Sequence, residues 1–180
     1  MADINVLTLV GSLRAASVNR QLAELAAESA PDGVTVTVYD GLGDLPHYNE
    51  DLDTEDAPAP VVALRAAAAQ ADAALVVTPE YNGSIPGVLK NAIDWLSRPY
   101  GNGALKDKPL AVIGSALGQY GGVWAHDETR KSFGIAGPRV VESLKLSVPS
   151  TTFDGKHPRE NSEVSAAVRD VVGKLAAEVG

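Results

Sequence analysis

Short apolar segments that look like β-strands alternate along this chain with segments that have helical spacing. The strand-like segments are rich in β-branched residues, and several are apolar nearly throughout. They cover Ile4–Val10, Val34–Tyr39, Ala73–Val77 and residues 110–113, with residues 139–146 as a less clear fifth strand. Parallel strands that helices cover on both faces have this composition. The alternation predicts an α/β three-layer sandwich around a five-stranded parallel sheet.

The segments between these strands carry apolar residues at intervals of three and four. This spacing indicates amphipathic helices. It recurs over residues 18–25, 61–71, 88–96 and 164–179. A further helix is expected to begin near the paired glycines at 121 and 122.

Length and composition narrow the classes of protein that this chain can belong to. A chain of 180 residues with 45% apolar content fits one domain, over residues 1–180. The net charge of −8 argues against nucleic acid or an anionic membrane as a partner. The chain has no cysteine, which excludes disulfides, thiolate nucleophiles and iron–sulfur clusters, so redox chemistry would need an organic cofactor. The stretch Ile4–Val10 is too short to span a membrane, and we expect a cytoplasmic protein.

The loop after the first strand, "GSLRAASVNR" at residues 11–20, combines one glycine with several hydrogen-bond donors. One glycine does not make the dinucleotide pattern G-x-G-x-x-G, and the Walker motif is also absent. Ser12, Arg14, Ser17 and Asn19 suit a terminal phosphate, held also by the positive end of the following helix. Ser17 could instead only cap that helix. Because this loop carries the most distinctive chemistry, we expect the strand order 2-1-3-4-5, in which ligands bind beside strand 1.

The loops after the third and fourth strands end at the same edge of the predicted sheet. The third loop begins "TPEYNGS" at residue 78, and its Tyr81 with the turn at Asn82 offers an aromatic surface and backbone donors for a flat heteroaromatic ring. Folding alone could also explain that turn. The donors of the fourth loop, "GSALGQYGG" at residues 114–122, could face the pyrimidine side of such a ring, or the loop could be a flexible connection.

Together these three loops resemble the NADPH-dependent FMN reductase family, a flavodoxin-like family that includes quinone, azo-dye and chromate reductases. The segment "GSLRAASVNR" is similar to the phosphate loop of that family, and "PEYNGSIPGVLKNAIDWLSRP" is similar to its flavin loop. The stretch "LPHYNEDL" at residues 45–52 resembles a segment that lies near the flavin. The resemblance implies a flavodoxin-like fold with bound FMN.

The resemblance also implies which residues bind FMN. The phosphate would be bound by Ser12, Arg14, Ser17 and Asn19, and the ring would be contacted by Pro79, Glu80, Tyr81, Asn82, Ser115 and the turn that begins at Gly118. The chain departs from the family pattern after the paired glycines, where Val123 and Trp124 stand in place of a frequent arginine.

The activity implied is an NAD(P)H oxidoreductase. Hydride would pass from NADPH or NADH to flavin N5, and electrons would then pass to a quinone-like, azo or other acceptor in a ping-pong sequence. No catalytic side chain is required, since the flavin performs the chemistry. The histidines at 47, 126 and 157 have no metal-ligand spacing, so we expect solvated or structural roles and no bound metal.

Two other functions remain open at this level. A flavodoxin-like electron carrier would bind FMN without oxidising nicotinamide, and an acidic surface suits docking on basic partners. A flavin-free interaction module would keep the fold alone. The resemblance further implies a homodimer or homotetramer, and large aromatic residues often anchor interfaces. The candidates are Trp95, Tyr100 and Trp124, although each could equally be a core residue.

Overall fold

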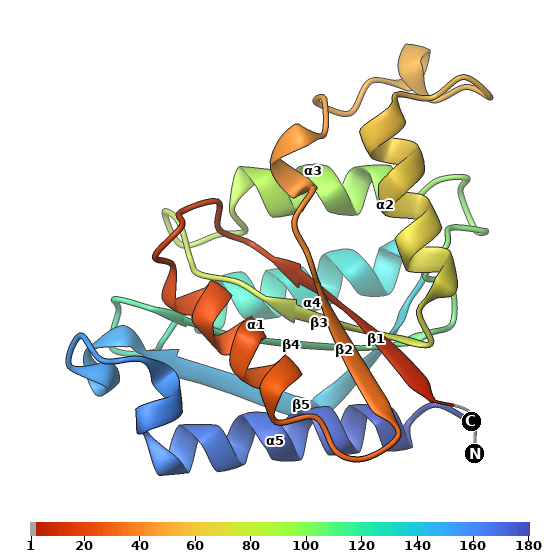
Figure 1. Cartoon of the computed structure of the whole chain (residues 1–180). Helices are drawn as coiled ribbons and strands as arrows, with labels where there is room; N and C mark the ends of the chain where they lie inside the picture. The colour runs from red at the N-terminus through yellow and green to blue at the C-terminus, as the bar shows by residue number, and fades with distance from the viewer. Residues whose placement is uncertain (1–2) are drawn as a thin grey trace.

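The computed structural model describes residues 3–180 and contains a five-stranded parallel sheet. Its order is β2-β1-β3-β4-β5, as predicted (Figure 1). The strands are β1 (Ile4–Val10), β2 (Val34–Tyr39), β3 (Ala73–Val77), β4 (Pro109–Ala116) and β5 (Arg139–Pro149). The first three coincide with the predicted segments, whereas β4 and β5 run beyond their predicted ends. The fold is therefore the expected flavodoxin-like α/β sandwich.

Helices cover both faces of the sheet. They are α1 (Val18–Glu28), α2 (Ala59–Gln70), α3 (Gly87–Leu96), α4 (Val123–Ala136) and α5 (Ser162–Ala177). Helices α1 and α5 pack on one face, and α2, α3 and α4 pack on the other (Figure 1). None of the helices in the described part of the chain has both the length and the apolarity needed to cross a membrane.

The core divides into two layers because side chains alternate along each strand. In β1, Val6 and Val10 pack among the residues of α1 and α5, while Leu7 and Leu9 pack among those of α2 and α3. Trp95 belongs to the second layer and is 0% exposed. Of the two roles considered for Trp95, interface anchor or core residue, the structure therefore supports the core.

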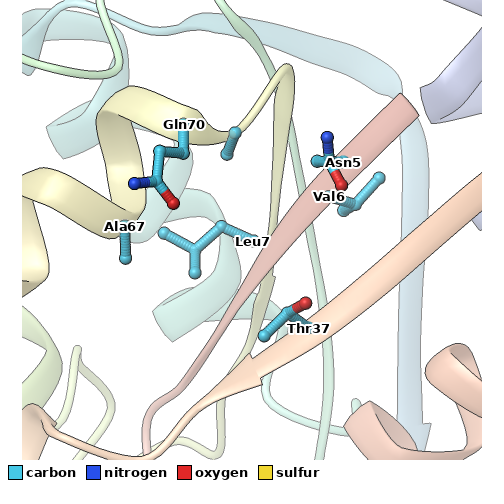
Figure 2. A pocket seen from close by; sticks show the side chains of 7 residues that line it. Asn5, Val6, Leu7, Thr37, Ala67 and Gln70 are labelled. Carbon is cyan, nitrogen blue, oxygen red and sulfur yellow. The ribbon is translucent and has the colours of Figure 1, made fainter. Parts of the chain in front are cut away.

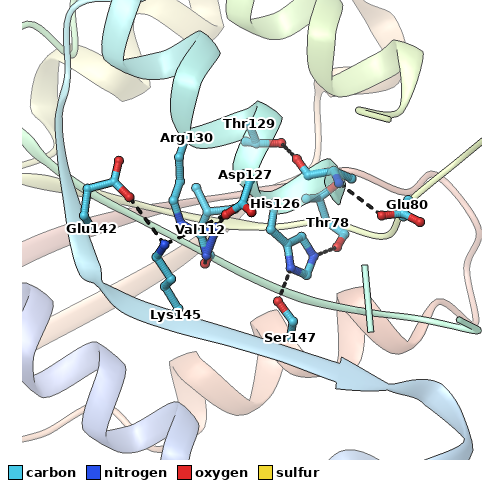
Figure 3. Close-up of polar contacts among 11 residues, drawn as sticks. Thr78, Glu80, Val112, His126, Asp127, Thr129, Arg130, Glu142, Lys145 and Ser147 are labelled. Atoms are coloured by element: carbon cyan, nitrogen blue, oxygen red, sulfur yellow. Dashed lines mark hydrogen bonds and ion pairs between the residues drawn. The ribbon is translucent and has the colours of Figure 1, made fainter. Parts of the chain in front are cut away.

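Helix α4 is unusual because much of its buried face is polar. Its buried residues include His126, Thr129 and Arg130 beside the apolar Phe133. The Arg130 guanidinium donates to the Val112 carbonyl over 3.2 Å, close to the point where the pairing of β4 with β5 shifts register (Figure 3). Burial, which outweighs the nearby carboxylates, lowers the pKa of Arg130. Hydrogen bonds to the sheet, and not apolar packing alone, hold this helix in place.

The long connection between β2 and α2 is fixed to α3. The indole nitrogen of Trp95 donates to the Pro46 carbonyl over 2.8 Å, and the Asn91 amide donates to the same oxygen over 3.0 Å. The Tyr48 ring meets the Trp95 ring edge to face, with centroids 4.8 Å apart. These contacts place the stretch that begins at Leu45 against the apolar layer of α3.

The first loop and the third loop meet at Gly11. Its amide donates to the Val77 carbonyl over 2.9 Å, which continues the β1–β3 ladder by one residue. A Cβ atom on Gly11 would lie 2.2 Å from Oγ1 of Thr78 and 2.8 Å from its Cβ. Only glycine lets the two strand ends approach this closely.

We predict that Gly11→Ala lowers the free energy of unfolding by about 1–3 kcal/mol, because the added methyl overpacks the contact with Thr78. Gly173→Ala is the matched control: it lies within α5, and its Cβ would meet no atom within 4 Å. That control should gain about 0.5–1 kcal/mol from helix propensity. Urea unfolding of the three proteins measures both effects. Equal stability of Gly11→Ala and the parent protein would contradict the close contact.

Candidate functional site

A cavity of about 250 Å³ opens at the carboxyl edge of the sheet, between the loops that follow β1, β3 and β4. It brings together most of the residues predicted to bind a ligand. These are Ser12, Arg14, Ser17, Asn19, Pro79, Glu80, Tyr81 and Ser115. Asn82 and Gly118 do not line it. Ligands of open α/β sheets bind at this edge.

The first loop presents the start of α1 to the cavity. Ser17 is the N-cap of α1, and its hydroxyl accepts from the Asn19 amide over 3.2 Å. The capping interpretation of Ser17 is thus confirmed, while the residue also lines the cavity. The positive end of the helix dipole therefore points at the space that a ligand would fill.

Arg14 supplies the positive charge of this loop. Its side chain is exposed and lines the cavity. It forms no ion pair with any carboxylate of residues 3–180. The nearby Arg20, in contrast, is paired with Glu24 and Asp40. Arg14 is the cation that an anionic ligand in this cavity would meet.

Asn19 joins the first loop to the fourth. Its side-chain nitrogen donates to the Ser115 carbonyl and its oxygen accepts from the Ser115 amide, both over 2.9 Å. Ser115 is 2% exposed, and its hydroxyl has no hydrogen-bond partner in the described part of the chain. Since a buried hydroxyl without a partner is costly, this group beside the cavity is suited to hydrogen-bond a ligand.

The third loop is a tight turn that carries an aromatic ring. Tyr81 and Ser84 exchange two backbone hydrogen bonds of 3.1 Å, with Asn82 at φ 53° and Gly83 at φ 73° between them. Two successive positive φ angles favour Asn-Gly. Asn82 therefore shapes the turn and does not face the cavity, while the Tyr81 side chain stays 50% exposed at the cavity wall.

Glu80 connects this loop to α4. One of its carboxylate oxygens accepts from the Ala125 amide over 3.1 Å, at the first turn of the helix (Figure 3). A carboxylate at a helix N-terminus is stabilised by the helix dipole. Glu80 therefore fixes the orientation of the third loop, although it also lines the cavity.

Sequence reasoning missed several residues of the cavity wall. They are Val18, Ala116, Leu117 and Ser150. Ser150 directly follows β5, which ends at Pro149 and not near residue 146 as expected. The alternation of side chains that continues to Val148 was the available signal. Leu117 is exposed at the cavity rim, where no periodic pattern marks it.

Two further hollows in the described part of the chain lack the same combination of groups. One of about 210 Å³ lies between the first half of β1, β2 and the end of α2 and is lined by Leu7, Thr37 and Gln70, among others (Figure 2). It contains no ionisable side chain. A hollow of about 270 Å³ shares Ser12 and Arg14 with the candidate site. Residues 3–180 contain no group of three or more histidines and carboxylates placed to hold a metal ion.

The comparisons with known proteins agree with this geometry. Residues 4–152 match the model of the family described as NADPH-dependent FMN reductase. A quinone reductase of Pseudomonas putida is 45% identical over 71% of this chain and 68% of its own length. An NAD(P)H-dependent FMN reductase of Pseudomonas aeruginosa is 40% identical over 86% of this chain and 83% of its own.

A solved structure shares the whole fold. FerB, a flavoenzyme NAD(P)H:(acceptor) oxidoreductase from Paracoccus denitrificans, is 33% identical and superposes with a TM-score of 0.83 over 98% of this chain and 99% of its own. The family match covers every strand of the sheet and every loop that lines the cavity. The chain therefore belongs to the NADPH-dependent FMN reductase family, a family of oxidoreductase enzymes.

Proposed function

We propose that this protein binds FMN in the carboxyl-edge cavity and uses it to pass electrons from NADPH or NADH to a quinone-like, azo or other small acceptor. One observation carries the proposal: a single cavity unites the donors of the first loop, the Tyr81 wall and the buried, unpartnered Ser115 hydroxyl. The names of the relatives from Pseudomonas support both the cofactor and the acceptor class. Since NAD(P)H is an intracellular reductant, we propose the cytoplasm as its compartment.

Bound flavin would supply the redox chemistry, taking hydride at N5 from NAD(P)H and giving electrons to the acceptor in separate, ping-pong half-reactions. The protein's own residues bind and orient. Ser12, Arg14 and Ser17, with the N-terminus of α1, would hold the terminal phosphate. Asn19 would contribute mainly by fixing the Ser115 backbone, because its oxygen and one of its N–H groups are already used there.

The ring would lie between the third loop and the fourth. Pro79, Glu80 and Tyr81 form one wall of the cavity, and Ser115 with Ala116 forms the other. Asn82 and Gly118 would contribute through the turns that they allow, since neither residue lines the cavity. Donors fixed in this way stabilise negative charge on a reduced ring without reorganisation, so the site needs no acid or base side chain.

We also propose that the chain assembles as a homodimer or homotetramer through α3 and α4. A groove of about 270 Å³ lies between these helices and is lined by Ile93, Arg98, Tyr100 and Ile135, among others. Tyr100 is 83% exposed and Ile135 is 72% exposed. Exposed apolar residues gathered beside a groove are typical of interaction surfaces.

We predict that the purified protein takes up FMN with one flavin per chain and that Arg14→Ala weakens its affinity about 10- to 150-fold. That range corresponds to losing one charge-assisted hydrogen bond of about 1.5–3 kcal/mol. Arg169→Ala removes the same charge from an exposed position of α5 outside the cavity lining and should bind FMN as the parent does. Fluorescence titration measures all three affinities. Unchanged affinity in Arg14→Ala would remove Arg14 from the phosphate site.

We predict that the FMN-loaded protein oxidises NADPH or NADH rapidly only when a quinone is present. Initial rates at varied concentrations of both substrates should give parallel double-reciprocal lines, the pattern of a ping-pong sequence. An electron carrier, the alternative that the net charge of −8 favours, would bind FMN and leave nicotinamide unoxidised. Protein that takes up no FMN would contradict both functions.

We predict a solution mass of two or four times the 18.7 kDa chain. Ile135→Glu should shift the mass toward one chain, because it places a charge in the proposed interface. Val62→Glu changes an exposed apolar residue of α2 and should leave the assembly intact. Size-exclusion chromatography with light scattering distinguishes the three proteins. A parent protein of one chain would contradict self-association, and equal masses for both variants would remove the α3–α4 face from the interface.

A further inference from the structure

The first two turns of α4 contact the third loop at several positions. Trp124 packs against the Asn82–Gly83 turn: a Cβ on Gly83 would lie 3.5 Å from Cε3 of the indole. Glu128 accepts from the Ser84 hydroxyl over 2.5 Å. Together with the Glu80–Ala125 hydrogen bond, these contacts make the start of α4 the support of the loop that forms one wall of the cavity.

His126 extends this support to the strand from which the loop departs. Its ring is 0% exposed, with Nε2 2.8 Å from the Thr78 carbonyl and Nδ1 2.6 Å from the Ser147 hydroxyl (Figure 3). A carbonyl only accepts, so Nε2 carries a proton, and in the neutral ring Nδ1 then accepts from the hydroxyl. A neutral ring thus satisfies both partners and links the ends of β3 and β5.

The backbone leaves room for this ring at two glycines. A Cβ on Gly114 of β4 would lie 2.7 Å from Nε2 of His126, and a Cβ on Gly122, the N-cap of α4, would lie 3.2 Å from it. Gly114 precedes Ser115, and Thr78 precedes Pro79; Ser115 and Pro79 stand on opposite walls of the cavity. One buried ring therefore touches the backbone from which both walls begin.

We propose that neutral His126 is a positioning residue for the cofactor cavity: it fixes the Thr78 carbonyl and the adjoining strand ends, and its protonation loosens the site so that FMN is released in acid. The inference rests on the proposed FMN site. The histidine touches neither cavity nor cofactor and acts through Thr78 and Gly114.

The surroundings of His126 favour the neutral ring. Burial is the main cause that lowers its pKa below the ordinary value, and the Arg130 charge lowers it further. The Thr78 carbonyl and the carboxylates of Glu80 and Asp127 act in the opposite direction without reversing the shift. On β5, Lys145 faces Asp127 at 3.9 Å, and on β4 Gly114, which has no charge, lies against the ring.

The sign of the pH dependence follows from this neutral state. An unfolded histidine takes up its proton near pH ~6.5, whereas the folded protein resists protonation until the pH is lower. Below about pH 6.5, the unfolded or loosened state therefore binds more protons than the folded state does. The contribution of His126 is complete above about pH 6.5 and is lost as the pH falls below it.

The experiment compares FMN affinity from pH 5 to 8 in the holoprotein and in three variants. His126→Gln keeps a donor for Thr78 but cannot take up a proton, so its affinity should stay near the parent's at pH 8 and fall less in acid. His126→Phe fills the space without a donor and should bind FMN roughly 3- to 10-fold more weakly at every pH, the effect of one lost hydrogen bond. His157→Gln, which lies outside the cavity lining, should follow the parent. The cofactor phosphate takes up its own proton near pH ~6, equally in all four proteins.

A second measurement tests the histidine without cofactor. Urea unfolding of the FMN-free proteins should show the parent and His157→Gln losing stability below pH 6.5 relative to His126→Gln. Superimposable pH profiles of the parent and His126→Gln in both measurements would overturn the proposal, as would parent-like FMN binding by His126→Phe. A parent protein that binds no FMN but still shows the His126-dependent loss of stability would support the structural role of His126. That result would overturn the proposed function instead.

Discussion

The contact between Gly11 and Thr78 determines how close the first and third loops come to each other. The Gly11 amide continues the hydrogen-bond ladder to Val77, and the missing side chain leaves room for Thr78. A ligand that spans both loops needs their donors within one small molecule's length. The Gly11–Thr78 contact is made by the backbone of Gly11. The shape of the cavity therefore does not depend on which polar side chains of the two loops bind a ligand.

The sequence predicted most of the sheet and much of the cavity because both depend on local patterns. Runs of β-branched residues marked β1, β2 and β3 correctly, and hydroxyl, amide and guanidinium groups after β1 marked the first loop. The start of α4 was expected near the paired glycines, but its course could not be predicted in this way, since its buried face carries His126, Thr129 and Arg130 where periodicity searches for apolar residues. His126 and Arg130 find hydrogen-bond partners on the sheet, and Thr129 donates to the Ala125 carbonyl of its own helix. The partners on the sheet are distant in sequence and leave no local signal.

From the sequence, a structural role and a ligand-binding role are alternatives for a side chain such as Ser17. The structure combines the two roles. Ser17 caps α1 and lines the cavity. The Glu80 carboxylate accepts from an amide in the first turn of α4 and lines the cavity too. A polar group that folding has already fixed loses little further entropy when a ligand arrives. Asn19 goes further, because its hydrogen bonds to Ser115 help to form the wall opposite the third loop.

Charge poses the remaining question, since a protein of net charge −8 is proposed to hold an anionic phosphate. Screening limits exposed charges to a range of about 8 Å at physiological ionic strength, so most surface carboxylates are not felt at the first loop. Arg20 lies near the first loop, but its positive charge is paired with Glu24 and Asp40. The phosphate would therefore be attracted by groups in direct contact with it. These are the exposed Arg14 side chain, the hydroxyls of the first loop and the start of α1. In the proposed site, contacts of this kind would select a compact terminal phosphate over an extended polyanion, because the positive charge of Arg14 and of the start of α1 is confined to one loop.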